Sequence, residues 1–95
     1  MIENVSRLIR HVEKVAGVKG LVVLDENNEK VDGKTYISSL NDGKDVEEFN
    51  IAIKKTSTVS DAIRFIQERT GLKNIEFRDE NGNRINGNKL ISSLN

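Results

Sequence analysis

The sequence contains no cysteine, no proline and no tryptophan, and its only methionine is the first residue. Without cysteine the chain can form no disulfide, no thiolate nucleophile and no zinc–thiolate site. About five prolines would be expected at ordinary usage in a chain of this length. Designers of idealised proteins keep proline out of helices and strands and reactive side chains off surfaces. The composition therefore suggests a de novo designed α/β protein, and a natural domain with little proline is the alternative.

The chain also lacks an excess of charge of either sign and any long hydrophobic run. Its 15 basic residues balance its 15 acidic residues, so the long-range field expected of a protein that binds nucleic acid or an anionic membrane is missing. No apolar stretch approaches the ~20 residues of a membrane span, and charges interrupt the first eleven residues, which excludes a signal peptide. We expect a soluble cytoplasmic protein that binds neither nucleic acid nor membranes.

What the chain does contain is one stretch twice. Residues 5–41 align with residues 59–95 at an offset of 54 without a gap, and 15 of the 37 aligned positions are identical. Unrelated segments of this length would share about 2. The sequence therefore predicts a single domain, residues 1–95, built from an internal duplication whose copies are joined by a linking strand at about 46–55.

Two amphipathic helices are predicted, over 3–16 and 58–70, because apolar residues recur on one face at the helical spacing. Gly17 and Gly71 are suited to end them. Thr58 with Asp61 three residues later forms a capping-box pattern at the start of the second helix. Each helix is followed by a hairpin, with strands at 21–25 and 75–79 reversing at Asn27-Asn28 and Asn81-Gly82, where both turn positions are expected to have positive φ.

Segments 35–40 and 89–94 are predicted to form one or two helical turns each. The alternation of apolar and polar residues over 47–55, with Phe49, Ile51 and Ile53 on one side, predicts a half-buried strand between the copies. The expected fold is α+β: a single mixed five-stranded sheet with two main helices on one face. Because the first copy has no strand before its helix, a homodimer formed by exchange of elements is a further expectation.

Part of the chain resembles ubiquitin-like β-grasp domains. Thr58-Val59-Ser60-Asp61, the apolar residues that follow and Gly71-Leu72 look like that family's helix, and residues 84–90 look like its closing strand and turn. The resemblance implies a protein-interaction surface on the sheet face or at the edge of the second hairpin. It does not imply conjugation, because the sequence ends in Leu94-Asn95 rather than a double-glycine tail.

A weaker resemblance, over 51–94, is to the phosphocarrier protein HPr. It implies a phosphorylated histidine near the start of the helix that follows the first strand. That region here reads Ser57-Thr58-Val59-Ser60 and contains no histidine.

Several short patterns suggest chemistry, but each fits a structural role better. Gly33-Lys34-Thr35 lacks the earlier glycine of a phosphate-binding loop. Asp79, Asn81 and Asn83 match the first three ligands of a calcium loop, but the glycine and glutamate required later are Arg84 and Leu90. The remaining candidates are the single histidine, the serine pairs, an acidic loop, a glycosylation sequon and a basic pair: His11, Ser38-Ser39, Ser92-Ser93, Asp42, Asp45, Glu47, Glu48, Asn4-Val5-Ser6, Lys54 and Lys55.

None of these candidates has the partners that its chemistry needs. A metal site or a general base at His11 would require partner residues, and the chain has no second histidine and no cysteine to supply them. The serine pairs have no base beside them, and an isolated hydroxyl is a weak nucleophile. We therefore predict no catalytic, cofactor-binding or metal site and no cofactor. The leading interpretation is a non-enzymatic, stably folding scaffold that requires no partner. A ubiquitin-like interaction module, with a protein partner, is the alternative, and an HPr relative without its active histidine is a remote third.

Overall fold

The computed structural model describes residues 1–94, and its elements follow the chain as helix, strand, short turn, helix, strand, short turn. The main helices are α1 (Val5–Ala16) and α2 (Val59–Thr70), and the strands are β1 (Leu21–Val23) and β2 (Ile75–Phe77). Single 3-10 turns, η1 (Ile37–Ser39) and η2 (Ile91–Ser93), follow the two hairpins. Every element of residues 58–94 thus lies 54 positions after a matching element of residues 4–40.

Both helices end at the glycines that the sequence predicts, and α2 begins after the predicted Thr58 cap, whereas α1 begins at Val5 rather than at residue 3. Gly17 and Gly71 end α1 and α2 in the left-handed conformation, with φ of 69° and 73°. The capping box at the start of α2 is confirmed: the Asp61 amide donates to the Thr58 hydroxyl, and the Thr58 amide donates to the Asp61 carboxylate. The side chain of Asn4 caps α1 by accepting from the Arg7 amide over 2.9 Å. Local side-chain chemistry therefore fixes both helix starts.

The strands of the two copies pair with each other. β1 and β2 run antiparallel, with Leu21 opposite Phe77, Val22 opposite Glu76 and Val23 opposite Ile75. The ladder continues at both ends, because the Leu24 amide donates to the Asn74 carbonyl and the Arg78 amide donates to the Gly20 carbonyl. Since these two bonds also differ by 54 positions, the ribbon has a local two-fold relationship centred on Val22 and Glu76.

The expected five-stranded mixed sheet is wrong, because the sheet of residues 1–94 has only the antiparallel strands β1 and β2. The return arms of the hairpins make isolated bridges, Leu24 with Lys30 and Arg78 with Arg84. Beyond them the chain leaves the sheet.

The carbonyls of the return arms bond the first turns of the helices. The amide of Ser6 donates to Gly33, and the amide of Ser60 donates to Gly87. A second bond, one residue earlier in each helix, runs from Val5 to Thr35 and from Val59 to Lys89. These bonds satisfy helix donors that have no partner within the helix, and they replace the longer ladder that the sequence suggested.

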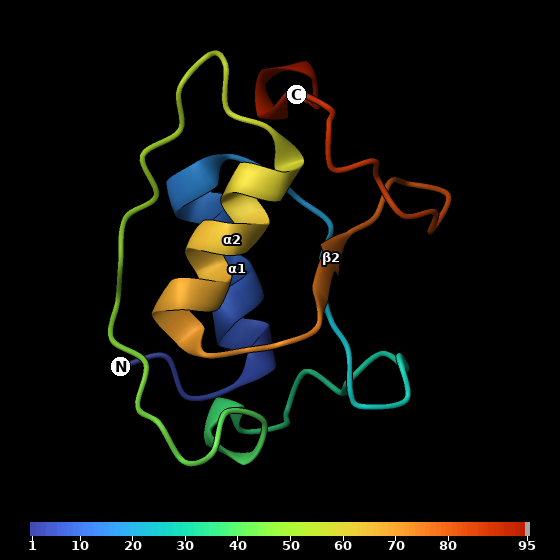
Figure 1. Cartoon of the computed structure of the whole chain (residues 1–95). Coiled ribbons are helices and arrows are strands. Elements are labelled where there is room, and N and C mark those ends of the chain that lie inside the picture. The colour runs from blue at the N-terminus through green and yellow to red at the C-terminus, as the bar shows by residue number, and fades with distance from the viewer. Residues whose placement is uncertain (95) are drawn as a thin grey trace.

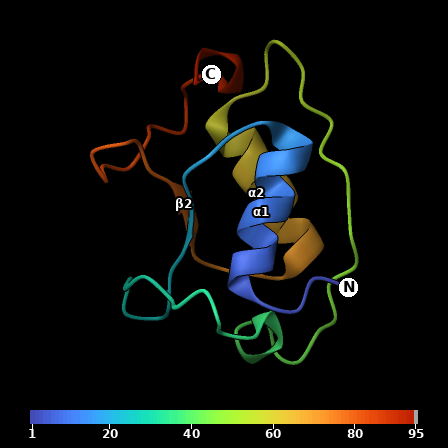
Figure 2. The same cartoon turned by 180° about the vertical axis from the view of Figure 1, so that it is seen from behind.

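The predicted linking strand at 46–55 is also wrong as a strand. The chain there is extended, and Phe49 and Ile51 are buried while Asn50 and Ala52 are exposed, so the alternation correctly indicated which side chains face the core. Figure 1 shows this segment on the side of the helices opposite β2, and Figure 2 shows the same order from behind. Its position across the helices keeps it away from the sheet.

One apolar core joins both copies and the linking segment. Its fully buried members come from each helix, each strand, both 3-10 turns and the linker, and include Leu8, Val12, Val23, Ile37, Val46, Val59, Ile66, Phe77 and Ile91. α1 packs against β1 and α2 packs against β2. No helix in residues 1–94 has the length and apolar character that a membrane span needs.

The hairpin turns differ from the expected two-residue type. Asn28 and Gly82 have positive φ, 61° and 80°, whereas Asn27 and Asn81 do not. The amide of Asp25 donates to the Glu29 carbonyl across three loop residues, and Asp79 and Asn83 are joined in the same way. This is a three-residue loop in which a single left-handed residue follows an ordinary turn.

Candidate functional site

The side chains that the sequence singled out are used to hold the backbone. Asp79, the first residue of the calcium-loop pattern, accepts through Oδ1 from the amides of Asn81 and Asn83, both at 2.9 Å. Asp25 does the same in the first hairpin, accepting from Asn27 at 2.8 Å and Glu29 at 3.0 Å. These carboxylates accept hydrogen bonds from loop amides that would otherwise have no acceptor within the three-residue loops.

The Gly33-Lys34-Thr35 pattern also serves the fold. The Lys34 amide donates to the Asp32 carboxylate over 2.8 Å, and the carbonyls of Gly33 and Thr35 accept from the start of α1. A phosphate-binding loop presents amides to its ligand. Here the loop presents carbonyls to a helix that is already capped.

His11 connects α1 to the linking segment. The Phe49 amide donates to His11 Nε2 over 3.2 Å, and the same nitrogen lies within hydrogen-bond reach of the Phe49 carbonyl. The two rings meet edge to face with centroids 4.9 Å apart. The imidazole is therefore bound to the backbone of a segment 38 residues away.

The serine pairs lie within the 3-10 turns η1 and η2. The hydroxyls of Ser39 and Ser93 each donate over 2.7 Å to the carbonyl three residues earlier, in Tyr36 and Leu90. The Ser92 hydroxyl is 3.4 Å from the Lys55 carbonyl. At the HPr-like position, Thr58 and Asp61 cap α2, as described above.

An asparagine that no sequence pattern singled out holds the acidic loop after η1 in place. Asn41 is buried, and its Nδ2 donates to the Thr70 carbonyl at 2.7 Å and to the Lys44 carbonyl at 3.1 Å. Its Oδ1 accepts from the Lys44 amide over 3.0 Å. The loop thereby closes onto the end of α2. Within residues 1–94 no group of three or more His, Cys, Asp or Glu side chains is placed to hold a metal ion.

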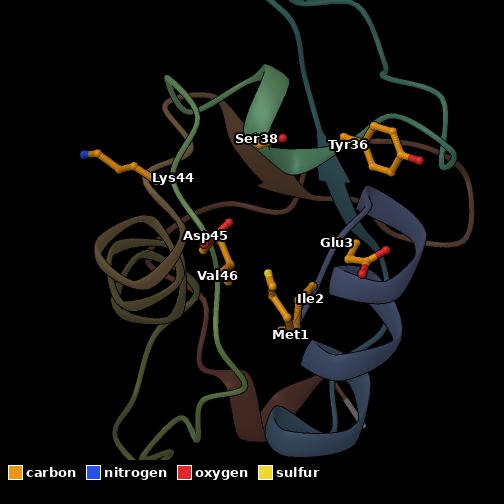
Figure 3. A pocket seen from close by; sticks show the side chains of 8 residues that line it. All are labelled: Met1, Ile2, Glu3, Tyr36, Ser38, Lys44, Asp45 and Val46. Atoms are coloured by element: carbon orange, nitrogen blue, oxygen red, sulfur yellow. The ribbon is translucent and has the colours of Figure 1, made fainter.

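One hollow on the surface combines apolar exposure with polar walls. It has a volume of about 350 Å3 and lies where the chain start, η1 and the loop before the linking segment meet. Figure 3 shows Tyr36 and Glu3 on one side and Asp45 and Val46 on another, with Met1 and Ile2 at the base. Two bonds build the hollow: the Ile2 amide donates to the Val46 carbonyl, and the Ile37 amide donates to the Glu3 carbonyl.

Met1 and Tyr36 are the most exposed of the large hydrophobic residues within residues 1–94, at 56% and 63%. No pattern in the sequence predicts this hollow. The available signal was Tyr36, the one tyrosine of the chain, at the position where the second copy has Leu90, which is also exposed.

Comparison with known proteins finds no matching family model, no similar curated protein and no similar solved structure. The ubiquitin-like and HPr-like resemblances therefore stay predictions.

Proposed function

We propose that this chain has no catalytic activity of its own and acts as a stably folded α+β scaffold. The observation that supports the proposal is the use of its reactive side-chain types. His11, Asp25, Asp79 and Ser39 each bond the backbone of a turn or of the linking segment.

The electrostatics of Asp61 fit this role. Hydrogen bonds from Thr58 lower the pKa of the Asp61 carboxyl, and the residue lies at the exposed start of α2, where it caps the helix. Strongly shifted pKa values tend to gather where enzymes bind substrate. Here the shift belongs to a helix cap.

The test compares stability before and after the candidate side chains are removed. Active-site residues are often held at a cost in stability, so their replacement commonly raises the melting temperature. We expect His11→Ala and Asp79→Ala to lower it, because each change removes hydrogen bonds to the backbone. Asn88→Ala, at an exposed side chain, is the matched control and should change it little. A clear rise for His11→Ala or Asp79→Ala would contradict the scaffold proposal.

A protein-interaction module is the second candidate, favoured by the hollow beside Met1 and Tyr36. Exposed aromatic side chains next to a concave surface are typical anchors for a partner. This site lies apart from the sheet face and from the edge of the second hairpin, the two surfaces that the ubiquitin-like resemblance implies, because within residues 1–94 no strand or hairpin residue lines the hollow. A partner of this site should lose affinity by about tenfold or more with Tyr36→Ala. Leu90→Ala, at the matching position of the second copy, should bind normally. Equal losses in both variants would count against the hollow.

A further inference from the structure

The hairpins of the two copies line matching grooves. The larger groove, of about 750 Å3, lies between the loop after α1 and the second hairpin. The smaller groove, of about 480 Å3, lies between the loop after α2 and the first hairpin. Asp79, Glu80, Asn81, Ser93 and Leu94 line the first, and the residues 54 positions earlier, Asp25, Glu26, Asn27, Ser39 and Leu40, line the second.

The charges of these grooves have opposite balance. The larger groove has four basic residues against two acidic residues, the basic ones being Lys19, Arg78, Arg84 and Lys89. The smaller groove has one basic residue, Lys73, against three acidic residues, Asp25, Glu26 and Asp42. Arg78 and Lys89 correspond to Leu24 and Thr35 in the first copy. A chain with zero net charge thus concentrates positive charge at one of two otherwise similar places.

The positive charge of the larger groove is only partly neutralised by the protein. Arg78 pairs with Glu76 over 2.7 Å, which is the one ion pair among residues 1–94. Lys19, Arg84 and Lys89 are exposed and form no ion pair within that range. Of the two acidic residues, Asp79 already accepts two backbone hydrogen bonds through Oδ1. The groove therefore has several cationic donors available to a ligand.

We propose that this groove binds a small anion that carries several phosphates. Arginine and lysine form strong charge-assisted bonds to phosphate oxygens, and arginine can do so with two donors at once. A volume of about 750 Å3 is in the range of small-molecule sites. The cations come from different segments, Lys19 from the loop after α1 and Arg84 and Lys89 from the second hairpin and the segment after it. A chain of phosphates, free or in a nucleoside triphosphate, carries several charged oxygens that can bond to cations from both segments at once.

The test is an NMR titration of the full chain with sodium tripolyphosphate, a nucleoside triphosphate and an oligoglutamate peptide in parallel. We expect saturable shifts confined to the loop after α1 and the second hairpin, with affinity that falls as salt rises. The double variant Arg84→Gln/Lys89→Thr should weaken tripolyphosphate binding by about tenfold or more. Its matched control, Lys30→Gln/Lys73→Gln, removes the lysine at the position that matches Arg84 and the one basic residue of the smaller groove, and it should leave the affinity unchanged.

Three results would overturn the proposal. The first is the absence of saturable shifts up to about 10 mM tripolyphosphate. The dissociation constant would then exceed this concentration, and such an affinity is weaker than that of a specific site. The second is equal shifts around both grooves, which would show general attraction to lysine and arginine. The third is tighter binding of oligoglutamate than of tripolyphosphate, which would assign the groove to acidic peptides. If the nucleoside triphosphate and tripolyphosphate bind equally, the phosphates are the part recognised; tighter binding of the nucleotide would add a contact to its base or sugar.

Discussion

Val22 on β1 lies directly opposite Glu76 on β2, and these two residues occupy the same position in the two copies. A strand that pairs with its own equivalent in this way can also pair with an identical strand, since the register is unchanged by the exchange. In the present chain the pair is asymmetric: Val22 is buried, whereas Glu76 reaches along its own strand to Arg78.

This register predicts how the separated copies will behave. A fragment of residues 1–45 should form a homodimer in which two β1 strands pair and Val22 faces Val22. A fragment of residues 56–95 should dimerise less tightly, because Glu76 would face Glu76 and like charges directly opposite in a ribbon are destabilising. Sedimentation equilibrium measures both association constants. Glu76→Val in the second fragment should strengthen its dimer, and an unchanged constant would show that the strand register does not govern association.

The linking segment gives the next prediction, because it is bound by side chains rather than by a sheet. Phe49→Ala removes a buried ring that contacts His11, and it should lower the free energy of unfolding by about 3 kcal/mol. Urea denaturation measures the change. Asn50→Ala, at the neighbouring exposed position, should have an effect within about 0.5 kcal/mol. If Phe49→Ala were equally mild, the linking segment would not be part of the core.

Burial and helix ends could be predicted from the sequence because their signals are local. The alternation around Phe49 identified the buried side chains, and Thr58 and Gly71 marked the two ends of α2. The alternation could not distinguish a strand from an extended segment, because it reports which side chains are buried and not where the backbone hydrogen bonds go. In this segment the Phe49 amide bonds His11, and no sheet partner is needed.

The sheet and the hollow could not be predicted for a different reason. The carbonyls of Gly33 and Gly87 bond the helix starts, and such contacts between distant residues leave no periodic pattern in the sequence. The hollow at Met1 and Tyr36 likewise forms only when the chain start meets the loop that Asn41 closes. The prediction that His11 has no chemical role rested on missing partners, and the structure shows that the residue contacts the backbone and ring of Phe49.

Gly20 provides a test of the close contact between β1 and β2. Its φ is +98°, and a Cβ atom there would lie 2.2 Å from the Arg78 carbonyl oxygen. Gly20→Ala must therefore move backbone that also carries the hydrogen bond from the Arg78 amide to the Gly20 carbonyl. We expect a loss of roughly 3 kcal/mol or more in unfolding free energy.

The matched control is Gly82→Ala, where φ is +80° but no atom lies within 4 Å of the added carbon. That variant bears only the strain of the left-handed conformation, about 1–2 kcal/mol. Gly82→Asn should be milder still, because Asn28 occupies the matching position with positive φ. Chemical denaturation of the three variants gives the order. A Gly20→Ala loss no larger than that of Gly82→Ala would mean that the strands can separate at this point at little cost.

Asp61 makes the stability of α2 depend on pH. Hydrogen bonds from the Thr58 backbone and then from the Thr58 side chain lower the pKa of Asp61 below its ordinary value of 3.8; the charge of Arg64 lowers it further, and burial opposes these effects. Because the pKa is lower in the folded chain than in the unfolded chain, the ionised carboxylate stabilises the fold above pH 3.8. This contribution is lost as the pH falls through the folded value.

The change that tests this is Asp61→Asn, which removes the charge at every pH. We expect the variant to be less stable than the parent at pH 7, and we expect the difference to shrink as the pH falls below about 4. Thermal unfolding measured between pH 2 and pH 7 shows both effects. Asn4→Ala removes the cap of α1, whose third helical residue is Arg7, so its loss of about 1 kcal/mol should be the same across this range. A pH-independent difference between the parent and Asp61→Asn would show that the carboxylate charge adds nothing to the helix cap.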